Sequence, residues 1–160
     1  MTAPVVLGID PGKHGAIAWA TGTGRLEVHD MPDATGAALG ALLADLILEN
    51  RPMVAYVERV GSMPGQGHMN VWTFAEGYGV ILGVLGALQV PVVHVTPGVW
   101  KKAAGLIKRK GETSAQAKTR SRQLAIETWP RCSHLFARAK DDGRAEAALI
   151  ARYGRAAAGA

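Results

Sequence analysis

The feature that most constrains this chain is a buried-strand pattern that ends in an acid. Residues Val5 to Ile9 form a continuous apolar run rich in β-branched side chains, and Asp10, Pro11 and Gly12 follow it directly. Such a run is typical of a central strand covered on both faces, and Pro-Gly predicts a tight turn. A side chain at this point faces the crevice where open α/β sheets bind ligands. Asp10 is therefore a candidate site residue, although Asp before Pro-Gly is also common in ordinary turns.

The rest of the chain alternates between strand and helix patterns in the order βββ-α-β-α-β-α-α-α. The strands are expected at Val5–Ile9, Ala16–Ala20, Arg25–Met31, Met53–Val57 and Val92–Val95. Helices are expected at Thr35–Asn50, Val71–Gln89, Val99–Leu106, Ser114–Thr128 and Asp142–Tyr153. Ser114 is the expected N-cap of its helix, Gly61–Asn70 a mobile loop, and 156–160 a frayed tail. This order predicts an α/β fold, a five-stranded mixed sheet flanked by helices, whose first three strands form an antiparallel meander.

Composition limits the class of protein. The 160 residues are 48% hydrophobic and 19% charged, enough for one domain over 1–160 with a real core. That length is too short for a two-lobed ATPase or kinase, so no nucleotide cofactor is expected. The single cysteine, Cys132, excludes a disulfide scaffold and a Cys-built zinc site. No signal peptide or membrane span is evident, so we expect a cytoplasmic protein with no membrane partner.

Positive charge is concentrated in one segment of the chain. Residues 1–100 carry 4 Lys and Arg against 8 Asp and Glu, a net −4, whereas residues 101–140 carry 11 against 2, a net +9. A segment of this kind predicts a polyanionic partner such as nucleic acid, with a solvated lysine-rich helix face as the alternative. The candidate DNA contacts are Lys101, Lys102, Lys108, Arg109, Lys110, Lys118, Arg120 and Arg122.

A second apolar strand also ends in an acid. Glu58 closes the run Val54 to Val57 as Asp10 closes the first run, and Arg59 follows it. If the two strands are neighbours in the sheet, their terminal carboxylates lie close together. The alternative is a surface ion pair between Glu58 and Arg59, which stabilises little.

A third group of acids lies at the start of the last expected helix. Asp142 and Glu146 are four residues apart and share one helix face, whereas Asp141 is rotated away. Asp142 as a simple N-cap residue is the alternative. Converging carboxylates repel one another unless a divalent cation is present, and oxygen ligands without cysteine select Mg²⁺ or Mn²⁺ over zinc. Two such ions can activate a water and stabilise the leaving oxygen of a phosphoryl displacement.

Four motifs, in chain order, resemble the RuvC family of Holliday junction resolvases, particularly its phage-type branch. They are GIDPG around Asp10, YVERV around Glu58, TPGVWKK from Thr96 and KDDGRAEAALIARYG from Lys140. The resemblance implies an RNase H-like fold, a homodimer and a hydrolase that cuts four-way DNA junctions with Mg²⁺. Two symmetric nicks by such a crossover junction endodeoxyribonuclease would leave 5′-phosphate and 3′-hydroxyl ends.

The resemblance also implies which carboxylates are catalytic and bind the metal ions. They are Asp10, Glu58, Asp142 and Glu146. The third departs from the bacterial pattern, in which the two helix acids are three residues apart, because Gly143 stands at that position here. Asp142 is assigned instead because it shares a face with Glu146, and Asp141 remains the alternative.

Other residues match positions that handle DNA in the family. Lys118 resembles a lysine that assists phosphate handling, and Lys101 a cation near the scissile strand, although both can be generic phosphate contacts. The Gly61–Asn70 loop with Trp72 and Phe74 lies where the family probes the junction centre, and a base stacked on an aromatic ring contributes roughly 1–3 kcal/mol. The alternative is that both aromatic side chains belong to the core.

Two choices stay open at this point. Gly79, Gly83 and Ala87 recur every four residues, as expected either for a dimer interface or for close packing within the chain. A nuclease of the same fold that cuts flaps or forks, and a non-catalytic junction-binding module, are the alternatives to a junction resolvase.

Overall fold

A five-stranded mixed sheet forms the centre of the computed structural model, which describes residues 4–32, 36–59 and 68–159. Its strands are β1 (Val5–Asp10), β2 (Ala16–Thr21), β3 (Leu26–Asp30), β4 (Val54–Glu58) and β5 (Val92–Val95). Their spatial order is β3-β2-β1-β4-β5. Strand β2 runs antiparallel to β1 and β3, whereas β4 runs parallel to β1 and β5. The predicted mixed sheet and the antiparallel meander are both confirmed.

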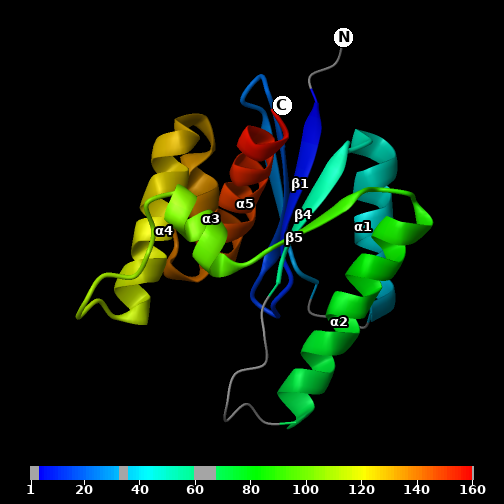
Figure 1. Ribbon diagram of the computed structural model, residues 1–160, viewed down its shortest axis with the longest axis horizontal. Coiled ribbons are helices and arrows are strands. Elements are labelled where there is room, and N and C mark those ends of the chain that lie inside the picture. Colours follow the sequence, from blue (N-terminus) through cyan, green and yellow to red (C-terminus); the bar gives the residue numbers. More distant parts are fainter. Residues whose placement is uncertain (1–3, 33–35, 60–67, 160) are drawn as a thin grey trace.

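Helices cover both faces of this sheet (Figure 1). On one side lie α1 (Gly36–Asn50) and α2 (His68–Ala87); on the other lie α3 (Pro97–Ala103), α4 (Ser114–Thr128) and α5 (Asp142–Ala158). Two short 3-10 helices, η1 (Pro130–Phe136) and η2 (Ala139–Asp141), connect α4 to α5. Because side chains alternate along a strand, Val6 of β1 joins the core beneath α5, and Leu7 and Ile9 join the core beneath α1.

Helix α5 lies unusually close to the sheet because two glycines leave room for it. A Cβ atom at Gly8 of β1 would overlap the backbone of Ala147 and Ala151 in α5. At the start of the helix, a Cβ atom at Gly143 would overlap the carbonyl oxygen of His14. The first turns of α5 are therefore pressed against the end of β1 and the turn that follows it.

Several expected boundaries are wrong, each for a local reason. Helix α2 begins at His68, inside the expected loop, of which 61–67 lies outside the described residues. The N-cap of α4 is Thr113: its hydroxyl accepts a hydrogen bond from the Gln116 amide, and the Gln116 side chain accepts one from the Thr113 amide. Helix α5 continues through the expected frayed residues 156–158, since alanine favours helix, and ends at Gly159 in the left-handed conformation.

The remaining differences concern the segments around α3 and between α4 and α5. Helix α3 starts at Pro97 and ends at Ala103, so Leu106 is buried in a loop and not in a helix. The 3-10 helices carry no clear helical period in the sequence and were not expected. No helix in the described ranges has both the length and the apolar character needed to cross a membrane.

Candidate active site

The two strand-terminal acids stand side by side at the carboxyl edge of the sheet. Strands β1 and β4 are parallel neighbours, and Ile9 is the register partner of Val57. The next residues along the two strands are Asp10 and Glu58. The sequence predicted that these two carboxylates lie close together if their strands are neighbours, and the two strands are neighbours.

Burial and mutual repulsion make these two carboxylates hard to ionise. Burial, followed by the charges of Glu58 and Glu146, raises the pKa of Asp10 from 3.8 to about 7, against smaller opposing effects of the Gly12 amide and Lys101. Glu58 is only 5% exposed, and burial raises its pKa, although a hydrogen bond from Trp100 acts in the opposite direction. Removing the proton from either carboxylate therefore costs more free energy here than in water.

Helix α5 adds two further acids, and each is paired with a lysine. Lys101 Nζ of α3 lies 2.9 Å from Glu146 Oε1, which also accepts a hydrogen bond from Ser121 Oγ at 3.3 Å. Lys118 Nζ of α4 lies 2.6 Å from Asp142 Oδ2. The pKa of Lys118 is raised first by this contact and further by the charges of Glu146 and Asp10, so the four acids belong to one group. We call Asp10, Glu58, Asp142 and Glu146 the acid cluster.

Asp141 lies apart from the acid cluster, in a separate ion pair. Its carboxylate accepts hydrogen bonds from the backbone and guanidinium of Arg138 at 2.8–3.2 Å and lies 3.9 Å from Arg144. Burial acts to raise the pKa of Asp141, but the hydrogen bonds from Arg138 outweigh it and leave the pKa below its ordinary value. Of Asp141 and Asp142, it is therefore Asp142 that lies beside Lys118 in the acid cluster.

The charge and donor chemistry of the acid cluster fit a hard dication, although the side chains are not gathered around a single point. Within the described part of the chain, no three His, Cys, Asp or Glu side chains are arranged to hold a metal ion. Lys101 and Lys118 balance two of the four carboxylates, so ionised Asp10 and Glu58 leave two negative charges. Carboxylate oxygens that carry two unbalanced negative charges suit one Mg²⁺ or Mn²⁺ ion, whose charge would neutralise them. A second ion would need the added charge of a phosphate.

Two residues of the site were missed by sequence reasoning. Trp100 of α3 is fully buried, and its indole Nε1–H donates to Glu58 Oε1 at 2.7 Å. Ser121 of α4 is 2% exposed and donates to Glu146. The adjacency of Trp100 to Lys101 was the one available signal, but only the position of α3 beside β4 reveals what the indole meets.

Comparison with solved structures supports the observed fold. No protein-family model matches the sequence, and no curated protein matches it. Among solved structures, Thermus thermophilus RuvC in complex with a Holliday junction substrate is similar, with a TM-score of 0.57 and 20% identity over 94% of this chain and 96% of that one. Another structure of the same RuvC has a TM-score of 0.55 and 21% identity, with the same shares covered. The yeast mitochondrial Holliday junction resolvase has a TM-score of 0.56 and 17% identity over 95% of this chain and 78% of that one.

The chain has the RNase H-like fold of RuvC. That sheet flanked by helices was the expected fold class. In this RuvC-like fold, the acid cluster lies at the edge where the central parallel strands end.

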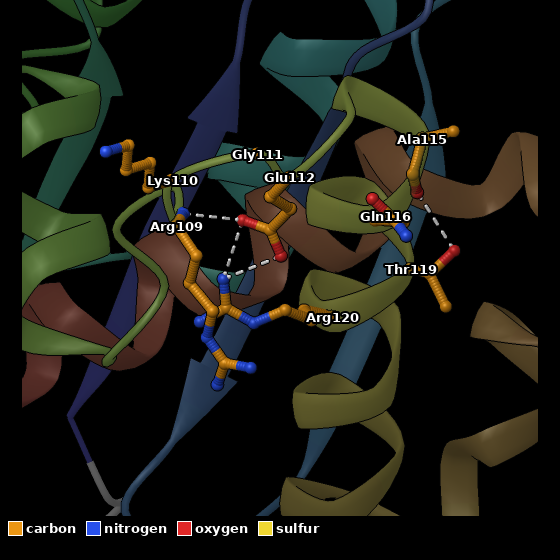
Figure 2. A pocket seen from close by; sticks show the side chains of 8 residues that line it. All are labelled: Arg109, Lys110, Gly111, Glu112, Ala115, Gln116, Thr119 and Arg120. Carbon is orange, nitrogen blue, oxygen red and sulfur yellow. Dashed lines mark hydrogen bonds and ion pairs between the residues drawn. The ribbon is translucent and has the colours of Figure 1, made fainter.

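The basic residues around the acid cluster differ in exposure and in their contacts within the described chain. Lys102, Lys108, Arg109 and Lys110 are exposed. Arg120 is held by contacts within the chain: its guanidinium donates to Glu112 at 3.0 Å (Figure 2) and to the Gly105 carbonyl at 2.7 Å. Arg122 donates to the carbonyls of Phe136 and Ala137. Both arginines fasten loops to α4, and their contact with DNA stays a prediction.

An open basic pocket of about 550 Å³ lies at the start of α4 (Figure 2). By helical spacing, Lys118 and Ser121 lie on another face of that helix. Its lining residues are Arg109, Lys110, Gly111, Glu112, Ala115, Gln116, Thr119 and Arg120. Glu112 neutralises Arg120 inside it, so the free positive charge belongs to Arg109 and Lys110.

The aromatic residues of α2 also differ from each other. Trp72 is 71% exposed, so its assignment to the core is wrong. Phe74 is half-buried and stacks on Tyr78 with ring centroids 5.8 Å apart.

Close packing within the described chain does not explain the glycines among the small residues that recur every four positions in α2, because a Cβ atom at Gly79 or Gly83 would meet nothing within 4 Å.

Proposed function

We propose that this protein is a Mg²⁺-dependent endonuclease that resolves four-way DNA junctions by phosphodiester hydrolysis, leaving 5′-phosphate and 3′-hydroxyl ends. The observation that carries the proposal is the acid cluster at the carboxyl edge of a RuvC-like sheet, with two lysines beside it. The RuvC structure named above was solved with a Holliday junction substrate, which favours the same class of substrate here.

Asp10, Glu58, Asp142 and Glu146 would hold the metal, with Mn²⁺ as a substitute. When bound, two Mg²⁺ ions supply an activated water and charge stabilisation for the leaving oxygen. The chain itself contributes the rest. Its strands β1 and β4 fix Asp10 and Glu58 relative to each other, and Glu58 is buried.

Lys101 and Lys118 are the proposed phosphate contacts nearest the reaction. Each ammonium is paired with a carboxylate of the cluster, at 2.9 and 2.6 Å. A phosphate that arrives with metal ions offers an alternative anionic partner, so each lysine can turn from its carboxylate to the scissile strand. Lys118 has the freedom to do so, because its side chain is 58% exposed.

The wider DNA surface is proposed to combine a basic loop with an exposed aromatic side chain. Lys102, Lys108, Arg109 and Lys110 would bind backbone phosphates, and affinity should then fall steeply with salt. Trp72 would stack on an unpaired base at the junction centre, with Phe74 supporting the helix that carries it.

The open glycine positions of α2 support a homodimer formed along that helix, as two symmetric cuts require. A second copy would fill the space left by Gly79 and Gly83. Light scattering at several protein concentrations tests this, and Gly83→Trp should shift the mass toward one chain. A monomeric wild-type protein that nicks both strands of a junction would rule the dimer out.

The decisive experiment is incubation with a synthetic immobile four-way junction, with and without Mg²⁺, beside flap, fork and linear duplex DNA. We expect junction cleavage that is lost in Asp10→Asn and Glu146→Gln while junction binding is kept, because phosphate contacts supply most of the affinity. Asp45→Asn and Glu49→Gln, exposed acids of α1, are the matched controls and should cut normally.

Three results would change the proposal. Preferential cutting of flaps or forks would assign the same chemistry to another branched substrate. Binding to the junction without cleavage in Mg²⁺ or Mn²⁺ would indicate a non-catalytic binding module. Cleavage by Asp10→Asn at near the wild-type rate would refute the role of the acid cluster.

A further inference from the structure

Two adjacent residues of helix α3 reach two different acids of the cluster. Trp100 donates its indole N–H to Glu58 Oε1 at 2.7 Å, and Lys101 donates to Glu146 Oε1 at 2.9 Å. The two side chains also touch each other, since Lys101 Nζ lies 5.0 Å from the centroid of the Trp100 ring. A single turn of α3 therefore couples the strand acid Glu58 to the helix acid Glu146.

We propose that Trp100 is a positioning residue of the active site, which holds the Glu58 carboxylate in the orientation that metal binding requires and guides Lys101 toward Glu146. The inference deepens the proposed function and rests on it. Because Trp100 is fully buried, we expect it to act through its contacts with Glu58 and Lys101 and not by direct contact with DNA.

The chemistry of the indole suits this task. Its N–H is a donor only and does not ionise near neutral pH, so its hydrogen bond to a carboxylate persists in every state of the site. The hydrogen bond occupies Oε1 of Glu58 and leaves Oε2 without a bond from the indole. If the Glu58 carboxylate rotated about its last side-chain torsion, it would lose this hydrogen bond. Water would not replace the bond, because Glu58 is 5% exposed and Trp100 is fully buried.

Packing holds the indole itself in place. Trp100 belongs to the core between the sheet and α5, together with Leu106, Leu149 and Phe136. A large ring in such a core has little freedom to turn. The position of its N–H is therefore set by the fold before any ligand binds.

The chain contains a matched control for losing a buried indole. Trp19 of β2 is 2% exposed and lies in the core on the opposite face of the sheet. Its Nε1–H has no hydrogen-bond partner within the described residues. Replacement of either tryptophan by phenylalanine removes the same atoms from a core, but only Trp100→Phe removes a donor to the acid cluster.

The test compares Trp100→Phe with Trp19→Phe and the wild type. Calorimetric titration with Ca²⁺, which binds oxygen ligands, measures metal affinity without turnover. We expect Trp100→Phe to weaken Ca²⁺ binding and to lower kcat on a four-way junction by about tenfold or more, as loss of a hydrogen bond to a charged group implies. Its KM for the junction should change by less than about twofold. Equal losses in the two variants, or normal metal affinity and kcat in folded Trp100→Phe, would overturn the proposal.

A second measurement does not depend on the activity of a tryptophan variant. The indole ¹⁵N–¹H resonance of Trp100, identified by its absence from Trp100→Phe or by sequential assignment, should move on Ca²⁺ addition and in Glu58→Gln, whereas the Trp19 resonance should not. An unmoved Trp100 resonance would refute the positioning role, even if Trp100→Phe does not fold. Absence of any cleavage by the wild type would instead refute the proposed function, while the response to Glu58→Gln would still decide whether Trp100 positions Glu58.

Discussion

Replacing Asp10 by asparagine should stabilise the metal-free protein at alkaline pH, although it removes a group that we assign to catalysis. The carboxylate of Asp10 faces the charges of Glu58 and Glu146, whereas the introduced side-chain amide would carry no charge while keeping an oxygen for the Gly12 N–H. The wild type must either take up a proton at this position or tolerate the repulsion.

The pKa of Asp10 sets the size and sign of the effect. The difference between its ordinary 3.8 and about 7 in the folded chain corresponds to about 4 kcal/mol, at about 1.36 kcal/mol for each pKa unit. Because the folded state binds the proton more tightly, this stabilisation is fully present below pH 3.8 and is lost as the pH rises through about 7. Between pH 5 and pH 8 the wild type should lose roughly 2.5 kcal/mol from this group, and Asp10→Asn should lose none of it.

Urea unfolding from pH 5 to pH 8 in the presence of a chelator measures this difference. Asp45→Asn, an exposed acid of α1, is the control and should follow the wild-type curve. Added Mg²⁺ should restore stability to the wild type at pH 8, by about 2.7 kcal/mol at a hundredfold excess over its Kd, and should do less for Asp10→Asn. If the free energy of unfolding changed with pH in the same way for the wild type and Asp10→Asn, the raised pKa of Asp10 and its assigned cause would be refuted.

Three further substitutions test how the surrounding structure is held. Gly143→Ala should destabilise the protein by about 1–3 kcal/mol in urea unfolding, because its Cβ would overlap the His14 carbonyl; an unchanged midpoint would contradict the close packing of α5. Arg144→Ala removes the bidentate pair with Asp30, both contacts 2.6 Å, and should cost about 1 kcal/mol at low salt and less at high salt. Arg120→Ala should speed amide hydrogen exchange in the loop before α4, and unchanged exchange there would show that this guanidinium does not hold the loop.

Sequence pattern alone was sufficient for the five strands and the five α-helices of the described chain, and it singled out the four acids of the acid cluster. The apolar runs before Asp10 and Glu58 identify central strands, and the four-residue spacing of Asp142 and Glu146 identifies one helix face. These are short-range signals, because periodicity and strand ends depend on neighbours in the chain. The same patterns misplaced the start of α2, where the polar residues around His68 predicted a loop. They also misplaced the start of α3, where Pro97 and Gly98 predicted a turn although proline is tolerated in the first turn of a helix.

The contacts between distant segments were decided only by the tertiary structure. Charge counting treats every basic residue of 101–140 alike, yet Arg120 and Arg122 turn inward to carbonyl groups while Lys108 and Arg109 remain exposed. Asp141 is separated from the acid cluster because Arg138 donates hydrogen bonds to its carboxylate just before α5 begins, whereas Asp142 remains with the cluster.

The sequence by itself determined which elements form and which acids end them, because hydrophobic periodicity and turn chemistry act over a few residues. Tertiary structure alone decided that α3 places Trp100 on Glu58, 42 residues away along the chain, and Lys101 on Glu146. Such pairings depend on where whole helices dock. That docking is set by the shape of the packed core, here by glycines that let α5 rest against β1, and no local pattern records it.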